Sequence, residues 1–334
     1  MASNLDWRPR FKALPDDADD TAVTETILRE IFRGNKDNIS RTQWYFEFYL
    51  RHPEIRWAFL ASMVSRNAGW NMCDLYGPTM RGLLDESERN QLLLTYERAN
   101  WMIFRDAFPQ LLLYHYSTEM RRPLLHLFEP FLISSYMKKE WSHYYQHKDG
   151  KRLMYAMIAN EQNVIQKPVI QHPVYQKRIF ISPLFYIQEW FHFSCVLFPT
   201  LHGQLYGFSV EGFRKLEERI QLGKRLSSIL FHRDLYPYFL RFSQNVEHTG
   251  SRYDFERYLH TKKRRDTPYL RAAIPVLEHH VHEFDDWSTS IKPKREWLSS
   301  QQEDIPASMT KWYLNKRKQL QTLQLMKDLL IRKE

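Results

Sequence analysis

The segment from Arg56 to Gly77 constrains the fold more than any other part of this chain. At 100° per residue, its apolar residues define one face of a helix centred on Leu60. Asn67, Asn71 and Asp74 continue the same face, so the stripe that should meet a core changes from hydrocarbon to amide and carboxylate. A buried polar group without a partner costs roughly 1–3 kcal/mol, and more when it is charged. Other helices must therefore present donors and acceptors to this one.

Composition favours an all-α protein. Of 334 residues, 43% are hydrophobic and 26% charged, which is typical of a folded globular chain with enough apolar material for a core. Only ten residues are glycine, while Leu, Glu and Lys are common, which argues against a sheet-rich fold. Aromatic residues reach 15%, which indicates thick helix–helix interfaces or a cavity walled by rings. We predict one large, irregular multi-helix bundle with a basic C-terminal helical extension.

Capping signals and periodicity place the helices. Ser40 with Gln43 and Asp85 with Glu88 have capping-box spacing and mark two helix starts, while Pro109 marks a helix end. The run 184–198 is apolar almost all round, which is typical of a central helix. The predicted helices cover 21–33, 41–52, 54–75, 91–108, 110–121, 124–146, 151–166, 184–198, 209–222, 224–232, 234–246, 251–260 and 310–332.

The charge pattern divides the chain. We predict an irregular lead-in over 1–20, the main bundle over 21–250, and a basic helical region over 251–334 that packs on the bundle. The formal net charge is +9, and this last region contains the run Lys262, Lys263, Arg264 and Arg265. Such a bias suits nucleic acid or an anionic membrane surface, and equally plain solubility. No helix-turn-helix, RNP or zinc-finger signature accompanies it.

The last helix also has an apolar face. Leu320, Leu323, Met326 and Leu330 share it, with Lys and Arg on the other positions. That face suits docking on the protein's own core, on a partner helix or at an anionic surface.

Polar residues interrupt the apolar stripes of two further helices. Glu97 and Asn100 do so in one, and Asn160 and Glu161 in the other. Together with Arg66 and the three residues of the first helix, they form the candidate polar centre: Arg66, Asn67, Asn71, Asp74, Glu97, Asn100, Asn160 and Glu161. Two interpretations remain open. The set is either a structural network that fixes helix register or a pocket that contacts a small polar ligand and supplies acid or base groups.

A divalent metal is a third hypothesis. Carboxylate-bridged metal pairs in helical bundles take a Glu from each of two helices and a Glu-x-x-His from each of two others. The matching residues are Glu97, Glu140, His143, Glu161, Glu189 and His192. About one Glu-x-x-His is expected by chance in a chain of this composition, so the match is weak.

A histidine-rich segment offers a second metal hypothesis. If this segment is helical, His279 and Glu283 lie four residues apart on one helix face, which is a half-site for zinc or another divalent ion. His280, His282, Asp285 and Asp286 lie beside them. The alternative is a solvated helix end.

Other chemistry has little support. The chain lacks G-x-S-x-G, P-loop and G-x-G-x-x-G motifs. Its two cysteines, Cys73 and Cys195, form no CxxC, which favours a reducing compartment. No run is apolar for the roughly 18 residues of a membrane span, and the N-terminus has no apolar signal core, so we expect a cytoplasmic protein.

The run Ser65-Arg66-Asn67-Ala68-Gly69-Trp70-Asn71-Met72-Cys73-Asp74-Leu75 resembles the YppC-like proteins of spore-forming Gram-positive bacteria, a family of uncharacterised proteins with a domain of unknown function. The resemblance implies a bacterial cytosolic protein. It transfers no activity, cofactor or catalytic residue. Three classes of function therefore remain: a ligand-binding or catalytic pocket, a scaffold or interaction protein that uses its basic end, and a metal-binding bundle.

Overall fold

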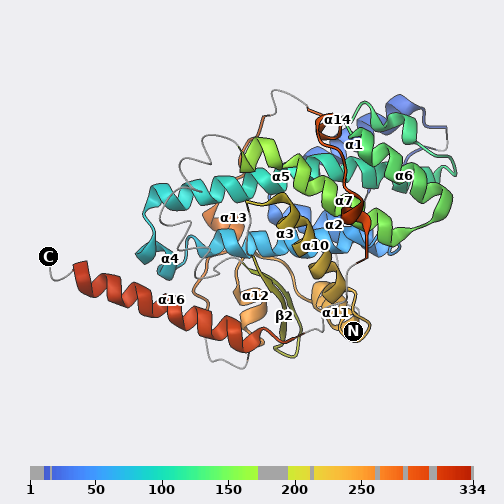
Figure 1. Cartoon of the computed structure of the whole chain (residues 1–334). Coiled ribbons are helices and arrows are strands. Elements are labelled where there is room, and N and C mark those ends of the chain that lie inside the picture. The colour runs from blue at the N-terminus through green and yellow to red at the C-terminus, as the bar shows by residue number, and fades with distance from the viewer. Residues whose placement is uncertain are drawn as a thin grey trace.

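Helices build nearly all of the structure, which confirms the all-α prediction (Figure 1). The computed structural model describes residues 11–15, 17–171, 195–210, 214–259, 264–280, 285–300 and 307–331. The longer helices are α1 (Asp20–Gly34), α2 (Asn38–Arg51), α3 (Trp57–Asp74), α5 (Glu86–Glu119), α6 (Ser135–His147), α7 (Gly150–Val164), α10 (Leu216–Leu230), α11 (Tyr236–Asn245) and α16 (Thr310–Ile331). The short ones are α4 (Pro78–Leu83), η1 (Leu125–Phe128), η2 (Gln166–Ile170), α12 (Tyr253–Glu256), α13 (Leu270–Ala273), α14 (Trp287–Ser290) and α15 (Arg295–Leu298).

The centre of the molecule is an aromatic core among α2, α3 and α5. Helices α3 and α5 run side by side along the length of the molecule (Figure 1), and α2 packs along α3. In this core Phe104 stacks on Phe108 with ring centroids 4.4 Å apart, and Trp57 is 1% exposed. A Cβ at Gly34 would lie 2.7 Å from Phe104 Cζ, so the end of α1 approaches α5 as closely as only glycine allows.

Helix α5 confirms one local sequence signal, at its start, and contradicts another, at Pro109. Its start has the predicted capping box, since Asp85 accepts from the Glu88 amide while the Glu88 side chain accepts from the Asp85 amide. The predicted end at Pro109 is wrong, because α5 continues to Glu119. Proline inside a helix costs about 3 kcal/mol. Residues 107–117 are all buried, and their packing offsets this cost.

The predicted central helix over 184–198 is wrong at its end, because Cys195–Pro199 form strand β1; residues 184–194 lie outside the described part of the chain. Strand β1 pairs antiparallel with β2 (Leu205–Ser209), and Leu197 lies opposite Gly207. Gly207 has φ +135°, and a Cβ there would lie 1.9 Å from the Val196 carbonyl oxygen. The hairpin therefore requires glycine at this position.

Helix α10 corrects a second boundary. The sequence predicts a break between 222 and 224, whereas α10 runs through Gly223. A Cβ at Gly223 would lie 2.6 Å from Ile158 Cγ2 of α7, so the glycine allows close helix packing and does not mark a helix end. Similarly, the predicted helix over 124–146 is a short 3-10 turn followed by α6, and the one over 251–260 is a single turn.

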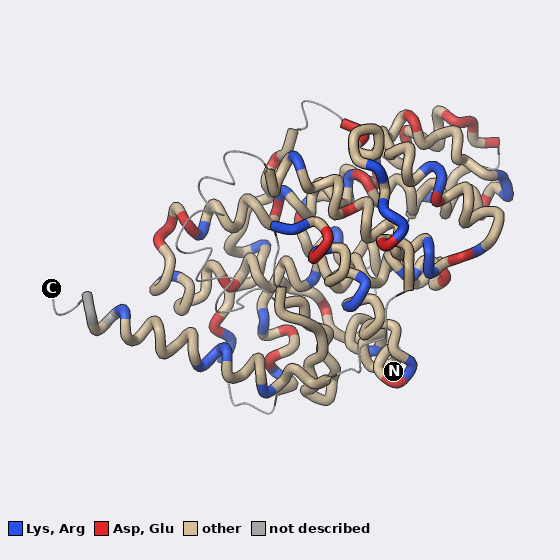
Figure 2. Tube along the Cα trace, viewed as in Figure 1, with Lys and Arg blue, Asp and Glu red and all other residues tan. Residues whose placement is uncertain are grey.

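The region after residue 250 contacts the bundle at several places. Trp287 and Trp297, from α14 and α15, belong to the main core beside α6 and α7. Helix α16 packs on α4 and projects along one edge of the molecule (Figure 1). Basic and acidic residues alternate over the body, while basic residues recur along α16 (Figure 2). No described helix is long and apolar enough to cross a membrane.

Candidate functional site

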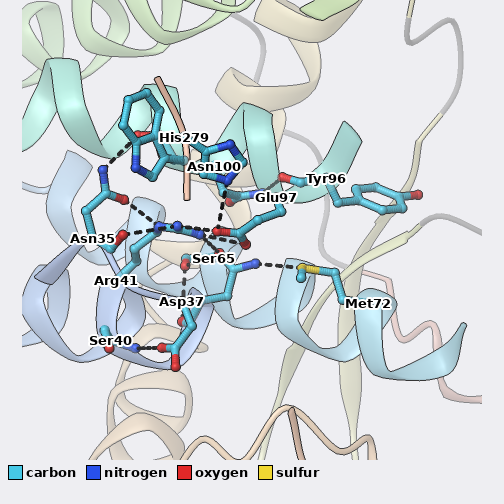
Figure 3. Close-up of polar contacts among 12 residues, drawn as sticks. Asn35, Asp37, Ser40, Arg41, Ser65, Met72, Tyr96, Glu97, Asn100 and His279 are labelled. Atoms are coloured by element: carbon cyan, nitrogen blue, oxygen red, sulfur yellow. Dashed lines mark hydrogen bonds and ion pairs between the residues drawn. The ribbon is translucent and has the colours of Figure 1, made fainter. Parts of the chain in front are cut away.

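A buried ion pair joins α2 to α5 (Figure 3). Arg41 Nη1 donates to Glu97 Oε2 at 2.9 Å, and Nη2 contacts the other carboxylate oxygen. The side chains of Arg41 and Glu97 are 1% and 3% exposed. His279 Nε2 lies 3.7 Å from Glu97 Oε1, and its ring packs against Trp101. Burial opposes ionisation of Glu97, but Arg41 and His279 together hold its pKa below the ordinary value.

Amide groups hold the guanidinium of this pair. Arg41 Nε donates to Asn35 Oδ1 at 2.7 Å, and Arg41 Nη1 is 3.2 Å from Asn38 Oδ1. Asn38 in turn accepts from Ser65 Oγ and donates to Met72 Sδ, which ties α2 to α3. Arg41 is therefore fixed by Glu97 of α5, by Asn38 of its own helix and by Asn35 in the turn between α1 and α2.

An open cavity of about 540 Å³ lies beside this network, between the end of α1, the start of α2 and residues 271–276. We call it the basic pocket, and its lining residues are Arg33, Lys36, Asp37, Ser40, Gln43, Trp44, Arg271, Ile274, Pro275 and Val276. Arg271 Nε donates to Asp37 Oδ2 at 2.8 Å, and Arg271 Nη2 donates to Ser40 Oγ at 3.0 Å. Asp37 also caps α2 by accepting from the Ser40 amide.

The walls of the basic pocket carry an excess of positive charge. Among the described lining residues, Asp37 is the one carboxylate, and Arg271 pairs with it; burial opposes ionisation of Asp37, but the hydrogen bond from Arg271 holds the pKa of this carboxyl below the usual range. Arg33 and Lys36 are exposed. The guanidinium of Arg33 lies 5.6 Å from the centroid of the Trp44 ring and pairs at 3.2 Å with Glu30, a buried carboxylate that is not among the lining residues given above.

A second buried cluster forms where α3 ends. Arg252 contacts Asp74 through Nε and donates to Asn71 Oδ1 at 2.8 Å through Nη2. Arg317 of α16 reaches the same place, 2.7 Å from Asp266 and 4.0 Å from Asp74. An adjoining cavity of about 30 Å³ has room for a water molecule and no larger ligand.

The other predicted residues of α3 contact backbone. Asn67 binds strand β1 like a neighbouring strand: it accepts from the Leu197 amide at 2.8 Å and donates to the Leu197 carbonyl at 2.9 Å. Arg66 donates to the Val246 carbonyl at 2.8 Å and lies over the Phe242 ring. Burial lowers the pKa of this guanidinium to about 10.

The polar residues of α7 form separate contacts. Asn160 accepts from Ser134 and Trp287 and donates to Asp106, and burial raises the pKa of Asp106 to about 7. Glu161 accepts from Trp57 Nε1 at 3.1 Å, and burial raises its pKa to about 8.

The eight residues of the candidate polar centre therefore belong to several networks. Asn100 donates to the Tyr96 carbonyl of its own helix, α5. No side-chain hydrogen bond between described residues joins any two of the eight. Asn71 and Asp74 alone share a partner, Arg252. The structure places most of these side chains inside the molecule but does not bring all eight to one cavity.

The described glutamates of the bundle-metal hypothesis have separate partners. Glu140 pairs with Arg152 at 2.7 and 3.0 Å, while Glu97 pairs with Arg41 and Glu161 with Trp57. Glu189, His192, His282 and Glu283 lie outside the described residues, as do Lys262 and Lys263. Within the described ranges, no group of three or more His, Cys, Asp or Glu side chains could hold a metal ion.

The remaining predicted site residues are a histidine of α6, the histidine segment and the basic run. His143 packs its ring 4.3 Å from that of His147. The chain from Pro275 to His280 is not helical, so His279 does not lie on the helix that the half-site with Glu283 requires; the proline after Ile274 prevents α13 from continuing. Arg264 and Arg265 are exposed, and Arg265 lies 4.1 Å from the Tyr269 ring.

Sequence reasoning missed the cationic partners. Arg41, Tyr45 and Phe48 share one face of α2, so an arginine occupies an apolar stripe there just as the amides do in α3. The sequence pattern alone could therefore have indicated that Arg41 is buried and paired. No local pattern indicates Arg252, because it follows a loop and precedes a single helical turn.

Comparison with known proteins gives a family and a relative, and the printed description of neither includes an activity. A family model described as "Protein of unknown function (DUF2515)" matches residues 33–314. The chain is 46% identical over 301 residues to the "Uncharacterized protein YppC" of Bacillus subtilis (strain 168), which covers 89% of this chain and 92% of the relative. No solved structure matches the chain.

Proposed function

This chain belongs to the DUF2515 family of proteins of unknown function, and we propose that it binds a small anionic ligand in the basic pocket. One observation carries the proposal: three cationic side chains, Arg33, Lys36 and Arg271, surround a cavity of about 540 Å³. Small-molecule sites in proteins commonly span about 300–1,000 Å³, so the volume suits a ligand of metabolite size.

The lining chemistry defines the class of ligand. Arg271 is set against Asp37 and Arg33 against Glu30, so Lys36 leaves a net positive charge at the cavity that favours a phosphate or carboxylate group. The first turn of α2 also faces the cavity through Ser40, and a helix N-terminus carries partial positive charge. Trp44 and Ile274 supply an aromatic and an apolar wall. The ligand should therefore combine an anionic group with an apolar or planar body.

The buried network beneath the basic pocket supports the proposal by fixing its walls. Asp37 and Ser40 are held by Arg271, and Arg41, one residue further along α2, is locked to Glu97. Walls that move little lose little conformational entropy when a ligand binds. The ion pair thus acts as a positioning element and does not itself contact the ligand.

Calorimetric titration of the full chain tests the proposal with three probes of different shape: inorganic phosphate, citrate and ADP. We expect at least one to bind, and we expect the double variant Arg33→Glu/Lys36→Glu to weaken that binding about tenfold or more, because both reversals place negative charge at the cavity. Both side chains are exposed, but Arg33 pairs with the buried Glu30, so circular dichroism should first show that the double variant is folded; Lys36→Glu alone leaves that pair intact and should weaken binding in the same direction.

The double variant Arg29→Glu/Lys139→Glu is the matched control, because it changes the net charge equally at exposed residues that do not line the basic pocket. Binding in the control should stay at the parent level. If none of the probes binds at millimolar concentration, or if the two double variants weaken binding equally, the basic pocket is not an anion site.

A further inference from the structure

We propose that the outer face of α16 docks on an anionic lipid surface. Helix α16 carries large aliphatic side chains exposed to solvent: Leu325 is 63% exposed, Met326 57% and Leu329 62%. The apolar face predicted from sequence is therefore split, because Leu320 turns inward and Met326 does not.

The inner face of α16 is already occupied by the protein itself. Tyr313 and Leu320 are buried, and Arg317 pairs with Asp266 at 2.7 Å. Further along, Gln324 packs on Gly82 of α4, and Lys327 Nζ donates to the Leu83 carbonyl at 3.0 Å. The helix is thus held along most of its length, with a defined side towards the bundle.

The exposed residues lie on the opposite side. At 100° per residue, Leu325, Leu329 and Met326 occupy a sector of about 100°, turned away from the sector of the buried anchors. Lys311 and Lys318 fall in the same outer sector and are exposed. The outer face therefore combines lysines near the start of the helix with aliphatic side chains near its end.

Charge selects the partner. From residue 310 to the last residue, the chain has seven Lys or Arg residues against two Asp or Glu residues. Two copies of α16 packed face to face would bring like charges together, whereas acidic headgroups complement them. A helix with aliphatic and cationic residues on one exposed face suits the membrane interface, where aliphatic groups enter the acyl boundary and lysines reach phosphates.

Vesicle co-sedimentation of the full chain tests this inference. Vesicles of phosphatidylcholine with phosphatidylglycerol should bind the chain, and vesicles of phosphatidylcholine alone should bind it at least about tenfold more weakly. Added salt should weaken the binding, since it screens exposed charges. The triple variant Leu325→Gln/Met326→Gln/Leu329→Gln should reduce binding to the anionic vesicles about tenfold, with an unchanged melting temperature because these side chains are exposed.

Leu94→Gln is the matched control, because Leu94 is an exposed leucine (43%) on α5. It should bind as the parent chain does. Sedimentation equilibrium tests the alternative that a second copy of the chain covers this face. A dimer that the triple variant dissociates, together with no vesicle binding, would assign the face to that second copy and overturn the inference. Vesicle binding that the triple variant leaves unchanged would also overturn the inference. The inference does not depend on the basic pocket, because the two sites share no residue.

Discussion

Replacing Glu97 by Gln tests the physical role of the buried ion pair most directly. The substitution keeps the volume of the side chain but removes the negative charge opposite Arg41, whose side chain is 1% exposed. Removing one partner of a buried pair costs about 3–5 kcal/mol, because the remaining charge stays desolvated. Asn35 and Asn38 still accept from the guanidinium, but neutral acceptors replace only part of a charge-assisted bond. We expect the free energy of unfolding to fall by about 3–5 kcal/mol.

The double variant Arg41→Met/Glu97→Leu completes the experiment. It removes both charges and leaves Asn38 bonded to Ser65 and Asn35 bonded to the Trp101 carbonyl. Apolar replacement of a buried pair is often neutral or stabilising, so the double variant should be more stable than Glu97→Gln.

Urea unfolding, followed by circular dichroism, measures these free energies. Glu217→Gln is the control, because Glu217 pairs with Lys294 at a surface where both side chains are 53% exposed, and its loss should be far smaller. A Glu97→Gln variant that loses less than about 1 kcal/mol would refute the reasoning, as would a double variant at least as unstable as the single one.

Three further predictions concern other parts of the structure. Burial, with His52 and Arg51 nearby, lowers the pKa of His115 to about 3; an unfolded histidine titrates near 6.5, so the unfolded state binds the extra proton and stability should fall by about 2 kcal/mol between pH 7 and pH 5. Urea titrations at several pH values should show this slope reduced in His115→Gln. Asn67→Ala should cost about 2–4 kcal/mol in the same assay, because it leaves a buried amide and carbonyl of β1 unpaired. If the run containing Arg264 and Arg265 binds nucleic acid, duplex DNA binding measured by fluorescence anisotropy should weaken steeply with salt, and no binding at low salt would exclude that function.

Local sequence signals predicted one of the two helix starts that capping boxes marked: the box of Asp85 and Glu88 is present, whereas α2 begins at Asn38 with Asp37 as its N-cap, so the box predicted for Ser40 and Gln43 is wrong. Asp85 and Glu88 lie only three positions apart, so the interactions that start α5 are contained in a short stretch of sequence and can be read from it. Pro109 is also a local signal, but it competes with the burial of about a dozen neighbours, which a reading of adjacent residues cannot weigh. The helix predicted over 184–198 is wrong at its end for the same reason. Residues 195–199 form a strand there, and part of its backbone is hydrogen-bonded by Asn67 of α3, 130 residues away in the sequence.

The polar centre shows a second kind of limit. A helical wheel gives the direction in which Asn67, Glu97 and Asn160 point, and these side chains are buried. It cannot give their partners, because those come from distant segments: Arg41 is 56 residues from Glu97, and Arg252 is 178 residues from Asp74. The expectation that the polar groups meet one another therefore needs the tertiary structure, and the structure divides them among separate cations and backbone groups.

This division makes stability and binding experimentally separable. If Glu97 serves only to position Arg41, Glu97→Gln should lower the free energy of unfolding and change ligand affinity at the basic pocket only slightly while the protein stays folded. Conversely, Lys36→Glu should change affinity and leave stability nearly unchanged, because Lys36 is exposed and its replacement leaves the pair of Arg33 and buried Glu30 intact. A loss of binding in folded Glu97→Gln as large as in the charge reversals would mean that the ligand reaches past Asp37 to the buried pair. The buried pair would then belong to the site itself.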